Sequence, residues 1–373
     1  MKKIAFLRMK PFPIPNRILP EVIGRAFPEY ELQIFDVMAR LERAPAVFAA
    51  NLLAMLAEYG PRLADGRMTR SEAFYATPYL FHWVRRQAQR WITPGEHAFS
   101  LQIQSLFDGS RPGVPHFVYT DHTHLARLEY PDFDRRSLRP ERWIELERSI
   151  YRSAALNFTR SSNISRSLRD QYHIPPERVA RVGVGSNLAA PGAASRAPDP
   201  SAKNILFVGI DWERKGGPDL VSAFRQVLAA HPDARLTIVG CSPSIDLPNC
   251  QVAGRVPVER MAEYYREASV FCLPTRIEPF GVVFIEALQY RLPVVATNVG
   301  AVPDLVQPGS TGCLIEPGDV DGLARALIEL LDDPARRATY GENGQRLVEL
   351  NYTWERVSDK MAAAIRGCLP PAA

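Results

Sequence analysis

Short apolar runs alternate with segments whose apolar residues recur at helical spacing along most of this chain. The clearest example lies in the second half. There the run VFCLPT at 270–275 predicts a buried strand, 283–290 predicts a helix, and LPVVA at 292–296 predicts the next strand. An acidic loop, RIEPFGV, separates the first strand from the helix. Units of this kind favour an α/β fold built on a parallel sheet.

The same alternation extends over both halves of the chain. Residues 3–8, 32–37, 98–105 and 116–119 predict strands of the first half, and 48–59 and 143–153 predict helices. Strands are expected again at 204–208 and 235–240, and helices at 261–268 and 353–367. Between the halves, residues 189–203 are rich in Pro and Gly and lack apolar periodicity, which is typical of a linker. The pattern therefore predicts two doubly wound domains, 1–188 and 204–353.

Composition agrees with an ordinary globular protein of about two domains. The chain has 373 residues, of which 46% are hydrophobic and 23% are charged. The apolar run near the N-terminus stops at Arg8, which is too early for a signal peptide, and no window approaches 18 consecutive apolar residues. Five scattered cysteines suggest reduced thiols. We therefore expect a cytoplasmic protein.

Charge is distributed unevenly between the halves. Residues 1–190 contain 27 Lys and Arg against 19 Asp and Glu, a balance of +8, which leaves 18 and 22 for the remainder, a balance of −4. Different partners for the two halves are one explanation, and dispersed arginines on solvated helices are the other. The segment 62–91 interleaves arginines with aromatic residues, a pattern also found on nucleic-acid surfaces. A helix with buried aromatics and a solvated arginine face explains it better, so no nucleic-acid partner is expected.

The acidic loop carries the chemistry of the second half. Glu278 and Glu286 are separated by seven residues and stand on either side of a Pro-Phe-Gly turn. Backbone N–H groups around Phe280, Gly281 and Val282 would face the crevice beyond the strand end, where a helix start favours an anion such as phosphate. Carboxylates accept hydrogen bonds from hydroxyls. Two such glutamates alone are usually solvated surface charges, but in this context they indicate a site for a sugar nucleotide.

A family resemblance supports this interpretation. The sequence EPFGVVFIEAL resembles the E-x7-E motif of family 4 of the retaining glycosyltransferases (glycosyl transferases group 1), and 298–319 resembles the next segment of that family. The resemblance covers nearly all of 200–367 with specific motifs and 1–190 more loosely. It implies the GT-B architecture, in which two doubly wound Rossmann-like domains face each other across a cleft. Residues 1–188 would bind the acceptor and 204–353 the donor, while a C-terminal helix, 354–373, would cross back to the N-terminal domain.

The resemblance also implies roles for individual residues. Lys215 stands beside glycines before a helix, where a point charge can meet a diphosphate, although a turn with solvated Arg214 and Lys215 is the simpler alternative. Glu278 would hold the donor sugar and Glu286 the ribose, with His122 contacting the sugar from the other domain. The catalytic set implied is Glu278, Lys215, Arg214 and His122, and the donor-binding set is Glu286, Phe280, Gly281, Val282, Gly209, Gly254, Arg255 and Val256.

Two departures from the family pattern stand out. Many members carry an arginine where this chain has Ile210, and Arg214 would then supply the second positive charge. The first loop is basic and Pro-rich where the family loop is Gly-rich, which makes Arg8 and Lys10 candidates for phosphate contacts. Ser161 matches a position where the family often carries serine. His124 would point the same way as His122 in an extended chain, but a metal pair would need a third ligand.

The activity implied is transfer of a sugar from a UDP-, GDP- or ADP-sugar to an acceptor hydroxyl with retention of configuration. It belongs to glycan, glycolipid or polysaccharide biosynthesis, and it requires neither a metal nor a cofactor. We expect a glycan or lipid-linked acceptor, with peripheral contact to an anionic membrane through the basic N-terminal half. The alternatives are another enzyme of this fold, a sugar-nucleotide epimerase or a phosphorylase, and a non-catalytic sugar-nucleotide-binding subunit.

Overall fold

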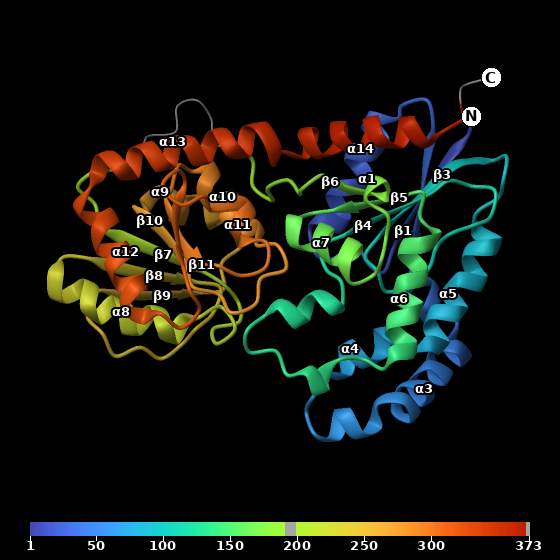
Figure 1. Ribbon diagram of the computed structural model, residues 1–373, viewed down its shortest axis with the longest axis horizontal. Helices are drawn as coiled ribbons and strands as arrows, with labels where there is room; N and C mark the ends of the chain where they lie inside the picture. The colour runs from blue at the N-terminus through green and yellow to red at the C-terminus, as the bar shows by residue number, and fades with distance from the viewer. Residues whose placement is uncertain (191–198, 371–373) are drawn as a thin grey trace. The chain divides into compact units, whose positions relative to one another are not determined.

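The computed structural model describes residues 1–190 and 199–370, which form two compact units (Figure 1). The N-terminal unit comprises Met1–Glu129, Phe133–Gly183 and the segment that begins at Trp354. The C-terminal unit comprises Tyr130–Asp132 and Val184–Thr353. The division thus falls after Gly183 rather than after 188, and it groups three residues near 131 with the C-terminal unit. Part of the expected linker 189–203 lies outside the described residues.

The N-terminal unit is built on a six-stranded parallel sheet with the order β2-β1-β3-β4-β5-β6. The central strands are almost continuously buried, as expected for parallel strands covered on both faces. Its strands are β1 Lys3–Arg8, β2 Glu31–Asp36, β3 His97–Ile103, β4 His116–Thr120, β5 Leu156–Thr159 and β6 Val179–Arg181.

Helices of the N-terminal unit connect these strands, and several begin with a capping residue. Thr69 and Glu72 form a reciprocal capping box at the start of α4, and the Thr77 hydroxyl accepts from the Leu80 N–H at the start of α5. The helices are α1 Pro15–Ala26, α2 Val37–Glu42, α3 Pro45–Ala64, α4 Arg70–Tyr75, α5 Pro78–Trp91, α6 Glu141–Ser153 and α7 Ser162–Asp170, with short 3-10 turns at Leu125–Glu129, Arg135–Ser137 and Pro176–Arg178.

The aromatic residues of 62–91 are buried or half-buried, while all the arginines of that segment except Arg62 are exposed. Phe81 and Trp83 are buried in the core of the unit, and Arg85, Arg86 and Arg90 on the same helix are exposed. This arrangement agrees with the interpretation of the segment as core aromatics beneath a solvated arginine face.

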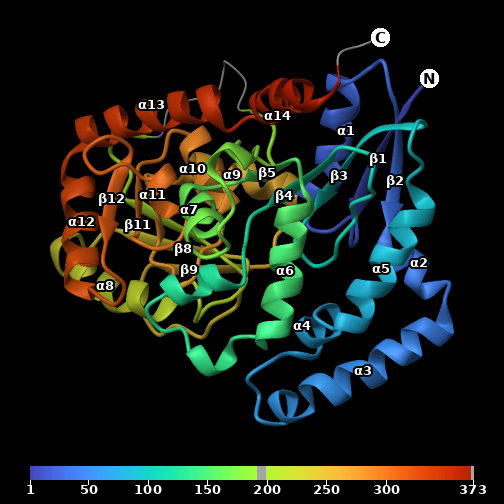
Figure 2. The same ribbon diagram turned by 45° about the vertical axis from the view of Figure 1, so that its right-hand side comes forward.

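The last helix, α14 (Trp354–Cys368), belongs to the N-terminal unit, where it lies beside α1 (Figures 1 and 2). Val357, Met361 and Ile365 recur on its buried face. The Ser358 hydroxyl donates to the Val22 carbonyl at 3.2 Å, and the Arg366 guanidinium donates to the Ala26 carbonyl at 2.6 Å. The carbonyl at the end of α1 thereby gains a charged donor.

The C-terminal unit has a second six-stranded parallel sheet, with the order β12-β11-β10-β7-β8-β9. Figure 1 shows α9, α10 and α13 on one face of this sheet and α8 and α12 on the other. The strands are β7 Asn204–Val208, β8 Arg235–Val239, β9 Cys250–Gly254, β10 Val270–Leu273, β11 Val294–Thr297 and β12 Gly312–Ile315. The helices are α8 Gly217–Ala230, α9 Met261–Glu267, α10 Val282–Gln289, α11 Val302–Leu305, α12 Val320–Asp332 and α13 Pro334–Asn351, with a 3-10 turn at Val258–Arg260.

Candidate functional site

The candidate site lies where the connections of the C-terminal sheet change direction. From β7 the chain proceeds to β8 and β9 on one side of the sheet, and from β10 it proceeds to β11 and β12 on the other. Open α/β sheets bind ligands at such a switch point, beyond the carboxyl ends of the two central strands. The loops at 209–216 and 274–281 follow β7 and β10 and therefore meet at this edge.

A buried ion pair joins the two loops. The Lys215 ammonium donates a hydrogen bond to a carboxylate oxygen of Glu278, and the two residues are only 8% and 4% exposed. Removing either charge from water is costly, and the opposite charge and the hydrogen bond compensate that cost. The structure therefore brings together two of the residues that the sequence assigned to the donor site.

Arg214 holds the same two loops through its backbone and its side chain. Its carbonyl accepts from the Arg276 N–H at 2.9 Å, and its guanidinium donates to the Ile277 carbonyl at 2.8 Å. The Nε atom donates to Asp211 at 3.1 Å. Much of the donor capacity of Arg214 thus maintains the loop geometry around Lys215 and Glu278.

Two glycines are required by the close packing of these loops: Gly216 where one loop meets the other, and Gly281 within its own loop and against α10. Gly216 has a φ of +73°, and a Cβ atom there would lie 1.9 Å from the Pro274 carbonyl oxygen. Gly281 has a φ of +82°, and its Cβ would lie 2.4 Å from the ring of Phe284 and 3.1 Å from the Glu278 carboxyl carbon. Both positions combine a left-handed backbone with a close contact, so only glycine fits. The Pro-Phe-Gly turn is therefore required to place Glu278.

Glu286 is buried on α10, where it has partners of its own. It is 5% exposed and accepts a hydrogen bond from the Tyr265 hydroxyl at 2.9 Å. Burial raises the pKa of the Glu286 carboxyl, whereas hydrogen bonds from Tyr265 and Asn187 lower it. Neither donor was predicted from the sequence, because both are distant in the chain and only packing brings them together.

The remaining residues predicted for the donor site lie near the same sheet edge or on the loop after β10. Gly209 follows β7 and donates its N–H to the Val239 carbonyl at 2.9 Å, and Gly254 ends β9. Ile210 replaces the arginine expected from the family and is 72% exposed. Phe280 is buried, Val282 is the first residue of α10 and half-buried, Arg255 is exposed, and Val256 is half-buried.

The two histidines after β4 differ in their environment. His122 is half-buried, and its Nδ1 atom is buried without a hydrogen-bond partner among the described residues. His124 is 3% exposed, and its Nε2 atom accepts from the Arg139 N–H at 2.8 Å. Burial lowers the pKa of His122 to about 4 and that of His124 to about 2. His124 thus holds the loop, whereas His122 keeps a neutral imidazole with an unused nitrogen.

Glu147 on α6 organises the backbone that carries His122. Its carboxylate oxygens accept from the His124 N–H at 3.1 and 3.2 Å and from the hydroxyls of Tyr151 and Tyr172. The Tyr172 hydroxyl in turn accepts from the Leu125 N–H at 3.1 Å. Sequence reasoning missed Glu147. The signal was present, because Glu147 lies four residues after Trp143 on the buried stripe of the helix.

The other residues predicted for the N-terminal half have local partners. Arg8 is 9% exposed, pairs with Asp36 on β2 and donates to the Asn16 carbonyl at 2.8 Å. Ser161 is fully buried, and its hydroxyl donates to the Asn163 side chain at 2.6 Å. Lys10 is exposed, with its ammonium 5.8 Å from the centre of the Tyr75 ring. The structure thus engages Arg8 and Ser161 within the fold.

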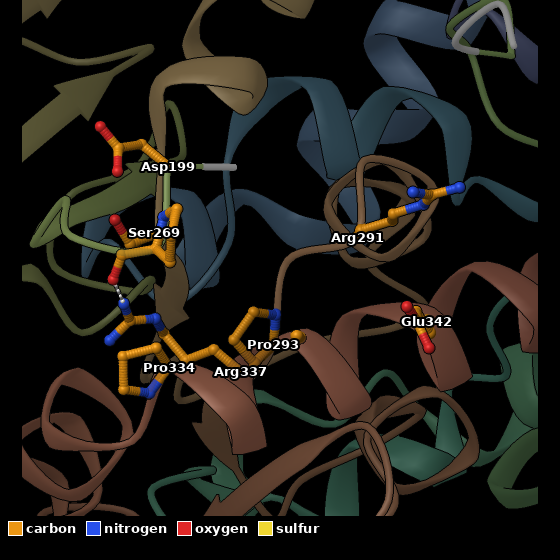
Figure 3. A pocket seen from close by; sticks show the side chains of 9 residues that line it. Asp199, Ser269, Arg291, Pro293, Pro334, Arg337 and Glu342 are labelled. Atoms are coloured by element: carbon orange, nitrogen blue, oxygen red, sulfur yellow. Dashed lines mark hydrogen bonds between the residues drawn. The ribbon is translucent and has the colours of Figure 1, made fainter. Parts of the chain in front are cut away.

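A small pocket of about 90 Å³ lies at the opposite edge of the C-terminal sheet, near the amino ends of β10 and β11 (Figure 3). Arg337 lines it, but its guanidinium donates to the carbonyls of Pro200, Leu330 and Leu331. This pocket therefore has no free charged group from Arg337 to offer a ligand. Across 1–190 and 199–370, no group of three His, Cys, Asp or Glu residues is placed to hold a metal ion.

Comparison with known proteins agrees with this geometry. Residues 202–333 match the family model of glycosyl transferases group 1. A GDP-mannose-dependent monoacylated alpha-(1-6)-phosphatidylinositol monomannoside mannosyltransferase of Corynebacterium glutamicum is 37% identical over 164 residues, 40% of this chain and 43% of that protein. A D-inositol 3-phosphate glycosyltransferase of Rhodococcus jostii is 29% identical and is matched over 69% of this chain and 62% of its own length. The chain thus spans less than two thirds of these relatives.

Solved structures show the fold. A sucrose-phosphate synthase from Thermosynechococcus elongatus matches with a TM-score of 0.71 and 20% identity over 98% of this chain and 99% of its own. WaaG, a glycosyltransferase involved in lipopolysaccharide biosynthesis, matches with a TM-score of 0.66 and 14% identity over 98% and 100%. The predicted GT-B fold of two Rossmann-like domains is confirmed. The assignment to family 4, the cleft and the roles of the individual site residues stay predictions.

The low histidine pKa values predict a loss of stability in mild acid. His116, like His122, has its pKa lowered to about 4 by burial, while an unfolded histidine titrates near 6.5. The unfolded state therefore binds more protons below about pH 6.5, so the free energy of unfolding falls as the pH drops towards 4. We expect the midpoint of thermal unfolding, measured by tryptophan fluorescence, to decrease as the pH is lowered from about 7 to about 5.

Matched variants test the cause. His124→Gln keeps a side-chain acceptor for the Arg139 N–H but cannot titrate, so the dependence of the midpoint on pH becomes shallower. His82 is exposed on α5, and His82→Gln is the control that leaves the dependence unchanged. Equal pH dependence in the two variants would contradict the explanation.

Proposed function

We propose that this protein is a retaining glycosyltransferase that moves a sugar from a nucleotide sugar to an acceptor hydroxyl. The bond between the anomeric carbon and the diphosphate breaks, a bond to the acceptor oxygen forms, and the nucleoside diphosphate leaves. The observation that carries this proposal is the buried pair of Lys215 and Glu278 at the switch point of a domain of the glycosyl transferases group 1.

The pair suits this substrate because a sugar nucleotide offers each member a new partner. The diphosphate is an anion for the Lys215 ammonium, and sugar hydroxyls are donors for the Glu278 carboxylate. Negative charge on the diphosphate grows as the glycosidic bond breaks, so Lys215 stabilises the transition state more than the ground state. Glu286 then holds the ribose hydroxyls. No step requires a metal ion or a cofactor.

The N-terminal unit is proposed to bind the acceptor, with His122 contacting the donor sugar. Its low pKa keeps His122 neutral near pH 7, so the imidazole exchanges hydrogen bonds with hydroxyls rather than pairing with phosphate. Relatives named for phosphatidylinositol mannosides and inositol phosphate support a lipid-linked or phosphorylated polyol acceptor.

Peripheral contact with an anionic membrane is the remaining part of the proposal. It rests on the charge of +8 carried by residues 1–190. Among the described residues, no helix has the length and hydrophobicity needed to cross a bilayer. We place the enzyme in the cytoplasm, where nucleotide sugars would reach it.

Donor binding is tested by thermal shift with a panel of UDP-, GDP- and ADP-sugars in excess EDTA. A ligand that binds the folded state increases the free energy of unfolding, by about 2.7 kcal/mol at a hundredfold excess over Kd. The melting temperature therefore rises. We expect one base to be preferred and the shift to persist in EDTA. Release of nucleoside diphosphate in the presence of acceptor then separates an enzyme from a binding subunit. No shift with any donor, or a shift only with Mg²⁺ or Mn²⁺, would contradict the proposal.

The roles of Lys215 and Glu278 are separated by single and double variants. Lys215→Met removes the charge that meets the leaving group, so kcat should fall roughly 100-fold with a smaller change in KM. It also leaves a buried carboxylate unpaired, which lowers stability. The double variant Lys215→Met/Glu278→Gln should regain the melting temperature but not the turnover. Recovery of kcat in the double variant would show that Lys215 acts only through stability.

The Glu147 network is expected to position His122, and two tyrosines provide a matched test. Both hydroxyls donate to Glu147, but only Tyr172 also accepts from the Leu125 N–H of the loop. Tyr172→Phe should lower kcat about tenfold, whereas Tyr151→Phe should only lower stability. The effect of Tyr172→Phe should disappear in a His122→Ala background. If the two tyrosine variants behave alike, the network is structural; if His122→Ala leaves turnover unchanged, the role of His122 fails instead.

A further inference from the structure

Helix α3 (Pro45–Ala64) presents an apolar face to solvent. Leu53 is 70% exposed, Leu56 56% and Leu52 38%. The helix has no exposed residue that is charged or polar. The exposed positions share the spacing of one helix face: Pro45, Ala46, Ala49, Leu52, Leu53, Leu56, Ala57, Pro61 and Ala64.

The inner face of α3 is also largely apolar, because Met55 and Tyr59 belong to the core of the unit and Phe48 packs against it. Its buried residues are Asn51, Met55 and Tyr59. The Asn51 amide donates to the Phe74 carbonyl at 3.0 Å and accepts from the Thr77 hydroxyl, and the Tyr59 hydroxyl donates to the Ala76 carbonyl at 2.7 Å. These polar contacts fix the helix with its leucines outward. The neighbouring helix α5 is ordinary, with Arg85, Arg86 and Arg90 exposed.

An open apolar hollow adjoins this face. It has a volume of about 670 Å³ and is lined mainly by aliphatic side chains and methionines, with Arg70 as its charged lining residue. Arg70 opens α4 and is exposed. The lining residues are Leu52, Met55, Leu56, Leu63, Ala64, Met68, Thr69 and Arg70.

Arginines gather at the C-terminal end of α3. Arg67 follows the helix and pairs with Asp65. Arg136, on the turn at 135–137, pairs with Asp134 and lies close enough to Arg67 and Asp65 to interact with their charges. Arg135 beside it is exposed. Together with Arg70 there are four arginines at this end of the apolar face and two carboxylates, those of Asp65 and Asp134. The net charge of the group is therefore positive.

We propose that the exposed face of α3 inserts into the interfacial region of an anionic lipid bilayer. Nine apolar residues along a helix of about 30 Å suit the acyl boundary, and the arginines at its end suit lipid phosphates. The positive charge at the C-terminal end of α3 favours an anionic lipid surface over a neutral apolar partner. This inference deepens the membrane contact of the proposed function, because it names the surface and makes the contact hydrophobic as well as electrostatic.

The two contributions respond differently to salt. Attraction between arginines and anionic headgroups weakens when salt shortens the screening length, whereas burial of leucines does not. In sedimentation with vesicles, the protein should pellet with phosphatidylcholine that contains about one third phosphatidylglycerol. A substantial fraction should remain bound in about 0.5 M salt. Release of all the protein by salt would leave only an electrostatic contact and overturn insertion.

Neutral substitutions test the apolar face without changing charge. Leu53→Gln/Leu56→Gln should lower the vesicle partition coefficient about tenfold and abolish the salt-resistant fraction. The control is Leu350→Gln, because Leu350 is 53% exposed on α13 of the C-terminal unit and should not affect binding. Arg67→Gln/Arg70→Gln should weaken binding at low salt only. Equal melting temperatures confirm that the variants remain folded.

The outcomes distinguish insertion of α3 from membrane contact through another surface and from dimer formation. Wild-type levels of vesicle binding in the double leucine variant would overturn the role of α3 while leaving peripheral contact intact. Binding of the wild type to neither acidic nor neutral vesicles would overturn both. A concentration-dependent dimer that the leucine variant loses would identify a second copy of the chain as the occupant. Transfer of sugar to a soluble acceptor, measured without vesicles, tests the glycosyltransferase activity separately.

Discussion

The ion pair of Lys215 and Glu278 constrains everything around the candidate donor site. Two charges can be kept out of water only if their geometry is fixed, and here they belong to loops 63 residues apart in sequence. The fold meets this condition by bringing the ends of β7 and β10 together at the switch point. Gly216 lets the first loop approach Pro274 of the second, Gly281 leaves room for Phe284 and the Glu278 carboxyl, and Arg214 ties one loop to the other.

The two units handle buried polar groups in different ways. The C-terminal unit matches charge with charge at Lys215 and Glu278, so neither charge is buried alone. The N-terminal unit surrounds the Glu147 carboxylate with hydroxyl and N–H donors and keeps His122 neutral. Burial raises the pKa of Glu147, and hydrogen bonds from the Tyr172 hydroxyl and the His124 N–H oppose this shift and hold a loop in place. The proposed function assigns the diphosphate to the first arrangement and the sugar hydroxyls to the second.

Much of the fold followed from the sequence, because buried parallel strands leave a clear signal. The predicted strand, acidic loop, helix and strand correspond to β10, the 274–281 loop, α10 and β11, with boundaries that differ by a residue or two. The pairing of Lys215 with Glu278 could not be predicted, since each is read from its own local motif. The hydrogen bonds from Tyr265 and Tyr172 were also missed, because they depend on packing between distant segments.

Helix α3 shows why periodicity alone gives a helix but not its orientation. Its sequence has two faces, one centred on Asn51, Met55 and Tyr59 and the other on Leu53 and Leu56. Both faces carry apolar residues, so hydrophobicity alone does not choose between them. The structure buries the face with Met55 and Tyr59, where Phe74 and Thr77 also satisfy the Asn51 amide, and a buried amide without partners would be costly. The leucines left in water contribute no burial to the stability of the folded chain. The apolar surface is therefore better explained by what it contacts outside the chain than by the packing of the chain itself.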